Sequence, residues 1–150
     1  MAIRTYIRRV RSGERTVNRT ITMGTFGELV FQSGMKKTMM PTGFSQEVGA
    51  KWSSVETPGD IEQSEFISPQ ARTLKFDVQF SAGLGVIPAQ MLNKVRRMVE
   101  TGEHHKLILG GKPVSGRDWY IESASESWDV VTARGKIYSA KVSLSLKQYR

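Results

Sequence analysis

The 150-residue sequence contains no cysteine, only two histidines and no long apolar run. The absence of cysteine excludes disulfides, thiolate metal sites and cysteine nucleophiles. No apolar stretch approaches the roughly 18 residues that a membrane-spanning helix needs. Six arginines lie in the first twenty residues, but no apolar segment follows them, so we expect no secretory signal.

Basic residues are in excess, with 22 Lys and Arg against 14 Asp and Glu, a net charge of +8 and a pI near 10.0. We therefore divide the chain into a basic N-terminal arm over residues 1–20 and one domain over residues 21–150. The 39% apolar content is typical of a soluble globular protein. The arm is either a solvated extension or a docking segment for another protein, and direct nucleic-acid binding is a third interpretation.

Alternating polarity predicts strands over most of the chain. In Arg72–Phe80, the apolar residues Leu74, Phe76, Val78 and Phe80 alternate with polar ones, which indicates a strand with one wet face. Two long strands, Trp119–Val131 and Ile137–Tyr149, are expected to flank the turn sequence "TARGK". The pairs are expected to be antiparallel.

The remaining segments give weaker patterns. We expect Ile21–Phe31 to be a strand in which Gly24 and Gly27 mark bulges or close backbone approaches. Phe44–Glu56 reads as one long strand with a flaw at Gly49. Thr57–Ala71 reads as a polar loop of about fifteen residues, with a short strand near Glu65–Ile67, and loops of this length are usually functional or mobile.

One amphipathic helix is predicted over about residues 88–101. Its apolar stripe repeats at helical spacing, Pro88 suits a first helical position, and Gly102 suits the left-handed residue that ends a helix. One helix of this length cannot supply a core, so it must cover a sheet. The fold class predicted is α+β, mainly β: a curved antiparallel sheet that curls toward a barrel, with one flanking helix.

No segment of the sequence has the pattern of a catalytic, cofactor or metal site. Glu122 and Glu126 lie four residues apart, about 13 Å along a strand and on one face, with Asp129 on the other face. A glycosidase pair needs two carboxylates that converge across about 5–10 Å, so we interpret these residues as the charged rim of a hairpin. The adjacent His104 and His105 should point in opposite directions, which prevents them from sharing a metal. The segments around Gly83 and Gly85 and around Gly110 and Gly111 lack the other residues of a phosphate loop.

Several ordered stretches resemble the tail protein U family of contractile-tailed phages, the GpU-type tail proteins. The match covers most of residues 24–149 and includes "GTFGELVF", "EVGAKWSSVE", the segment Leu74–Trp128 and "ARGKIYSAKVSLSLKQY". The residues that carry the resemblance are Gly24, Phe26, Gly27, Trp52, Gly102, Gly110, Gly111, Trp119, Glu126, Gly135 and Tyr149. The arginine-rich start and the stretch Thr57–Ala71 depart from the family pattern.

The resemblance implies a non-enzymatic virion protein with a fold related to the phage tail tube. It implies a homo-oligomeric ring, usually sixfold, at an end of the tube: either the ring that initiates the tube on the baseplate hub or the terminator ring at the other end. Partners would be other tail proteins, with DNA only as cargo, without a membrane or a cofactor, and assembly would take place in the host cytoplasm. We expect ring contacts at Arg4, Tyr6, Arg8, Arg9, Arg11, Asp60, Ile61, Phe66 and Trp128.

Two other classes of function stay open from the sequence. The basic arm is compatible with a nucleic-acid-binding module, which would bind DNA with a steep dependence on salt. The carboxylates near Trp128 are compatible with a hydrolase only if at least two of them converge in a concave site.

Overall fold

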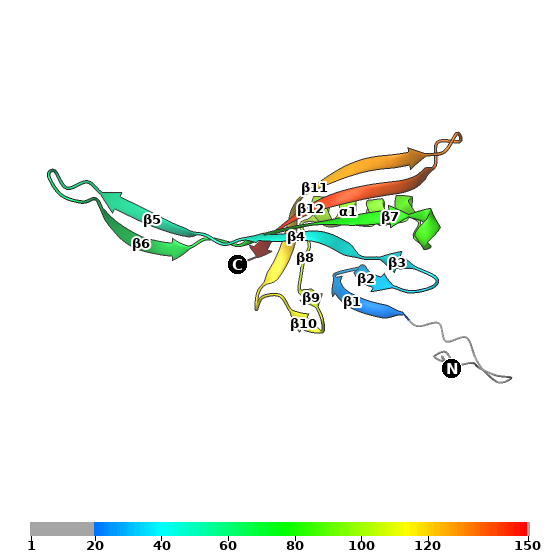
Figure 1. The fold of residues 1–150 in the computed structure, drawn as a ribbon, viewed down its shortest axis with the longest axis horizontal. Helices are drawn as coiled ribbons and strands as arrows, with labels where there is room; N and C mark the ends of the chain where they lie inside the picture. Colours follow the sequence, from blue (N-terminus) through cyan, green and yellow to red (C-terminus); the bar gives the residue numbers. More distant parts are fainter. Residues whose placement is uncertain (1–19, 150) are drawn as a thin grey trace, which may run out of the picture.

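The computed structural model describes residues 20–149, and it is mainly β with one α-helix (Figure 1). The strands before the helix are β1 (Ile21–Phe26), β2 (Leu29–Ser33), β3 (Thr38–Met39), β4 (Pro41–Glu47), β5 (Ala50–Val55), β6 (Gln63–Pro69) and β7 (Thr73–Ser81). A 3-10 turn, η1 (Ala82–Leu84), leads to α1 (Pro88–Thr101). The later strands are β8 (His104–His105), β9 (Leu107–Leu109), β10 (Lys112–Pro113), β11 (Asp118–Val131) and β12 (Ile137–Tyr149).

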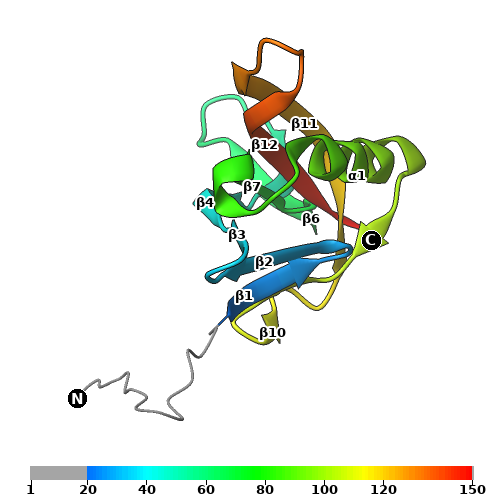
Figure 2. The same ribbon diagram turned by 90° about the vertical axis from the view of Figure 1, so that its right-hand side faces the viewer.

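The strands form two five-stranded antiparallel sheets and a separate two-stranded ribbon. One sheet has the order β10-β9-β1-β2-β3, the other has the order β4-β7-β12-β11-β8, and β5 pairs only with β6. Figure 2 shows α1 beside the long strands β11 and β12, with the β1–β2 hairpin below it. Side chains from both sheets and from α1 meet in one hydrophobic core, so the predicted α+β, mainly β class is confirmed.

The helix is the element that the sequence predicts best. It begins at Pro88 and ends at Thr101, where Gly102 adopts the left-handed conformation with φ 69°. The stripe residues Leu92, Val95 and Met98 are completely or almost completely buried. They pack toward the inner face of the second sheet, where the alternation predicted for β7 and β12 places another apolar layer.

The strands β7 and β12 form the centre of the second sheet. They pair without interruption from Ser81 and Ser139 at one end to Thr73 and Lys147 at the other. Phe76 faces Leu144 across this pair, and both side chains are buried. The uninterrupted pairing fixes which residues of each strand enter the core.

The expectation for Ile21–Phe31 is corrected in part. The segment is a hairpin of two strands, because Gly27 has φ 58° and makes the turn between them. The expectation for Gly24 is confirmed: it lies at a bulge in β1, and a Cβ atom there would approach the backbone oxygen of Ile108 to 1.9 Å. Only glycine allows β9 to lie this close.

The expectations for Phe44–Glu56 and Thr57–Ala71 are corrected more strongly. The long strand is divided into β4 and β5 near Gly49, and much of the predicted loop is β6, which pairs with β5. The amide of Gln70 donates to the carbonyl oxygen of Gly49 at 3.0 Å, so the β5–β6 ribbon continues outward from the paired β4 and β7. The short strand expected near Glu65–Ile67 lies within β6 and is confirmed. Almost every residue of the ribbon is exposed, and without a buried face no clear alternation indicates the full length of β6 or its pairing with β5.

The turn at Gly85 gives a test of this architecture. Gly85 has φ 81°, and a Cβ atom there would lie 1.8 Å from the backbone oxygen of Lys36. We expect Gly85→Ala to lower the free energy of unfolding by more than about 1 kcal/mol, because both the conformation and the space exclude alanine. Urea unfolding would measure the difference.

The matched control is Gly116→Ala, where a Cβ atom would meet no other atom within 4 Å and φ is not left-handed. This variant should stay within about 0.5 kcal/mol of the parent. Equal stability of the two variants would contradict the close packing of the Lys36 loop on Gly85.

Candidate assembly surfaces

The carboxylates near Trp128 have separate structural partners. Glu126 receives two hydrogen bonds from Arg96 of α1, from Nη2 at 2.6 Å and from Nε at 2.8 Å, and one from Trp128 Nε1 at 3.2 Å. The bond from Arg96 lowers the pKa of Glu126 below its ordinary 4.5, and it outweighs the opposite effect of partial burial. Glu126 is therefore held ionised as a brace between α1 and β11.

The other two carboxylates point elsewhere. We expected Glu122 and Glu126 on one face, and this is wrong, because a bulge between Ile121 and Ser123 shifts the register of β11. Glu122 instead lies 3.7 Å from the Nζ atom of Lys147, on the face away from α1. Asp129 accepts a hydrogen bond from the Ser127 hydroxyl at 3.4 Å. No two of the three carboxylates converge.

A hollow of about 430 Å³ lies on the second sheet, and it lacks the two converging carboxylates of a hydrolase site. Its only ionisable side chains are those of Lys75 and Asp77, and the other lining residues include serines of β11 and β12. Asp77 is bound by the Ser143 hydroxyl at 2.7 Å and lies 3.7 Å from Lys141 Nζ. None of the three carboxylates near Trp128 lines this hollow.

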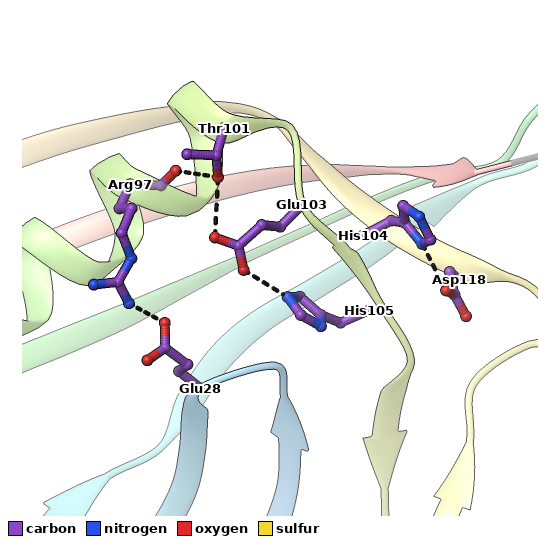
Figure 3. A network of polar contacts seen from close by, with 7 residues as sticks. All are labelled: Glu28, Arg97, Thr101, Glu103, His104, His105 and Asp118. Atoms are coloured by element: carbon purple, nitrogen blue, oxygen red, sulfur yellow. Dashed lines mark hydrogen bonds and ion pairs between the residues drawn. The ribbon is translucent and has the colours of Figure 1, made fainter.

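The two histidines point in opposite directions, as expected. His104 Nδ1 lies 2.7 Å from Asp118 Oδ2, and His105 Nε2 lies 3.0 Å from Glu103 Oε1. Figure 3 shows the two rings on opposite sides of the chain. The ring of His104 also stacks on Tyr149 with centroids 4.0 Å apart. Within residues 20–149, no three His, Asp or Glu side chains are grouped as metal ligands.

The same network ties the end of α1 to its surroundings (Figure 3). The Thr101 hydroxyl lies 2.7 Å from the carbonyl oxygen of Arg97 and 2.9 Å from Glu103, and Arg97 forms an ion pair with Glu28 at the β1–β2 turn. Hydrogen bonds from His105 and then Thr101 lower the pKa of Glu103. These contacts join three elements and have the character of a structural brace.

The β5–β6 ribbon is the first exposed surface of note. In Figure 1 it extends well beyond both sheets. The rings of Trp52 and Phe66 meet edge to face across it with centroids 5.4 Å apart, yet they are 59% and 52% exposed. Asp60 and Ile61 lie in the turn at its tip, where the Ile61 amide donates to Asp60 Oδ1 at 2.7 Å. Asp60, Ile61 and Phe66 are thus brought onto one projection.

Trp128 lies away from the ribbon, on the outer half of β11, where its side chain is 54% exposed. Its partner Ala140 pairs in turn with Phe80, near the end of β7 opposite to the ribbon. The predicted contact residues therefore divide between the two ends of the second sheet. Those of the arm, from Arg4 to Arg11, lie outside the described residues.

The residues that carry the family resemblance mostly shape the fold. Phe26 and Trp119 are buried in the core. Among the residues that carry the resemblance, five glycines have positive φ: Gly27, Gly102, Gly110, Gly111 and Gly135. Trp52 differs from Trp119 in being exposed, so it is not part of the core.

The exposed apolar residues opposite to the ribbon are not among the contact residues predicted from the sequence. Val130 and Val131 end β11, Tyr138 follows the turn, and each is between 45% and 49% exposed. The only indication in the sequence is that these residues flank the predicted "TARGK" turn. There the β11–β12 hairpin extends beyond the end of the neighbouring strand β7.

The brace at Glu126 predicts a pH-dependent stability difference. We expect Glu126→Gln to lower the free energy of unfolding by about 0.5–1 kcal/mol at pH 7. Because folding lowers this pKa, the stabilisation is complete above the ordinary value of 4.5 and disappears as the pH falls through the folded-state pKa. Urea titrations of both proteins between pH 7 and pH 3 would measure this, with Asp129→Asn as the control. A difference that persists unchanged at pH 3 would exclude the ionic origin.

No helix in the part of the chain that the structure describes is both long enough and apolar enough to cross a bilayer. A comparison with curated proteins finds no match. A comparison with family models matches residues 27–150 to the model described as Phage P2 GpU. This match covers everything from the β1–β2 turn to the end of the chain, including the ribbon and the long hairpin. The chain therefore belongs to the Phage P2 GpU family, and it is a phage tail protein.

Proposed function

We propose that this protein is a structural component that forms a ring, six copies in the family pattern, at the end of the tail tube where the tube begins on the baseplate hub. The observation that carries the proposal is the placement of exposed aromatic side chains at both ends of one sheet, Trp52 and Phe66 on the ribbon and Trp128 and Tyr138 opposite. Two different surfaces on one chain favour head-to-tail contacts between copies, and such contacts form a ring when the rotation from copy to copy closes.

Open strand edges support the same function. In the second sheet β8 pairs with β11 only at Trp119 and Tyr120, so the rest of β11 has β12 as its only strand neighbour among the described residues. An edge of this kind offers backbone amides and carbonyls to a neighbouring chain. In a tail protein that assembles with copies of itself, a neighbouring copy can pair with or cover this edge. We propose that residues 21–150 act as one tail-tube-like unit.

The charge on the second sheet favours a structural role over nucleic-acid binding. On the face away from α1, Lys141 lies near Asp77 and Lys147 lies near Glu122. Serines at positions 123, 125, 143 and 145 fill much of the surface between them. Such a face carries little net charge, and it would let DNA pass as cargo without strong phosphate contacts.

The test of the proposed function has two parts. Light scattering coupled to size-exclusion chromatography and negative-stain electron microscopy of the purified chain should show a closed oligomer without added ligand. Cryo-electron microscopy of assembled tails should then locate the chain where the tube meets the hub. A location at the head-proximal end would identify the protein as the terminator ring and not as the ring that initiates the tube.

A monomer at high concentration that is also absent from tails would contradict the whole proposal. Tight DNA binding that weakens steeply with salt would favour the nucleic-acid-binding module instead.

The basic arm gives a further prediction. The arm carries six of the 22 basic residues, and we propose that it contacts a neighbouring copy or ring. Deleting residues 2–19 should weaken ring formation and tail assembly, because the arm's contacts are lost while the described core is intact. Chromatography of the truncated chain and complementation of tail assembly would measure this. Unchanged assembly would exclude a docking role for the arm.

A further inference from the structure

The apolar side chains of the β5–β6 ribbon have no cover within the described residues. Trp52, Val55 and Phe66 are each more than half exposed, and the ribbon touches the sheets only at its base. A two-stranded ribbon that packs on nothing is at best marginally stable in water. Exposed apolar groups gathered on one projection mark an interaction surface.

The charge of the ribbon identifies the kind of partner. Residues 47–69 contain five acidic residues and one lysine, in a chain with a net charge of +8. The acidic residues are Glu47, Glu56, Asp60, Glu62 and Glu65. None of them forms an ion pair with another described residue. The surface that covers the ribbon should therefore be apolar and basic.

The chain itself carries such a surface, at the opposite end of the second sheet. We call it the far end and define it as the turns 34–37, 82–85 and 131–138. The exposed apolar side chains there are Met35, Leu84, Val131 and Tyr138. The basic residues there are Lys36, Lys37, Arg134 and Lys136, and residues 34–37, 82–85 and 131–138 contain no acidic residue.

The three turns of the far end are held together by tight packing. The carbonyl oxygen of Lys36 fits against Gly85, and the hydroxyl of Tyr138 fits against Gly83, so that a Cβ atom at either glycine would clash or crowd. The three turns of the far end therefore form one continuous, packed surface.

A ribbon cannot reach the far end of its own chain. The ribbon continues from the Thr73 end of β7, whereas the β11–β12 turn lies beyond the Ser81 end. Figure 1 shows the two projections pointing to opposite sides of the molecule. Any contact between them joins two copies.

We propose that the β5–β6 ribbon of one copy docks on the far end of the next copy, and that this contact links the ring; the inference rests on the proposed function. The acidic tip lies against Arg134 and Lys136, and the aromatic pair Trp52–Phe66 lies against apolar side chains of the neighbour. A symmetric contact between two ribbons would oppose like charges and is disfavoured. The contact is therefore head-to-tail, with a different surface from each copy.

Two variants separate the two halves of the contact. The ribbon variant is Trp52→Ser with Phe66→Ser, and the far-end variant is Arg134→Glu with Lys136→Glu. Each alone should raise the concentration needed for ring assembly by about tenfold or more. Lys112→Glu, on the exposed short strand β10, is the matched control and should assemble like the parent. Light scattering coupled to chromatography would measure all four proteins.

Mixing provides the decisive measurement. The ribbon variant keeps an intact far end, and the far-end variant keeps an intact ribbon, so an equal mixture should form one-to-one heterodimers that neither variant forms alone. No heterodimer, or rings that persist in both variants, would overturn the inference while leaving the ring itself established. A wild-type chain that never forms rings would overturn the proposed function as well.

Charge reversal provides a second, independent measurement. Glu62→Lys with Glu65→Lys should weaken assembly as the far-end variant does, and combining all four reversals in one chain should restore it. This set keeps the aromatic pair, so it remains informative if the ribbon variant fails to fold, which thermal unfolding by circular dichroism would detect. Combined reversals that assemble no better than either pair alone would overturn the proposed pairing.

Discussion

The rest of the structure depends on the packing of one helix against one sheet. The stripe of α1 meets the inward residues of β7 and β12, and Leu92, Val95 and Leu144 are almost completely removed from water. Burial of apolar area is the main source of stability in a chain of this size, and cysteine is absent from the sequence. The bidentate bond from Arg96 to Glu126 then fixes the helix to the outer half of β11.

The sequence predicts those elements that have one buried face. In β7 and β12 every second side chain enters the core, and in α1 the stripe recurs at helical spacing, so each pattern is visible in the letters. The ribbon has no buried face, and its pairing of β5 with β6 is therefore absent from the pattern. The sequence indicates β5 and part of β6 as separate strands, but their pairing into a ribbon is recognisable only once the chain is folded.

The residues of the candidate surfaces could also be predicted from the sequence only in part. Alternation from Trp119 onward is interrupted by the bulge after Ile121, which places Glu122 and Glu126 on opposite faces, and nothing in the letters locates a bulge among serines and glutamates. Phe66 could be proposed as a contact residue from the polar, irregular stretch around it, whereas Trp52 was predicted only as a residue of the family pattern. The far end could not be proposed as a contact surface from the sequence. It joins three turns that are distant in sequence and that meet only through the close packing at Gly83 and Gly85.

The connection at Gly49 separates two parts of the chain whose side chains are constrained differently. Inside it, side chains are locked into shared volume, so a change at one position requires adjustment at several others. Beyond it, the ribbon is joined to the sheets by its two connecting chain segments and the hydrogen bond from Gln70 to Gly49, and its length, tip and charge can vary without repacking the interior. A tail lineage could exchange this appendage to recruit a different neighbour while keeping the same scaffold.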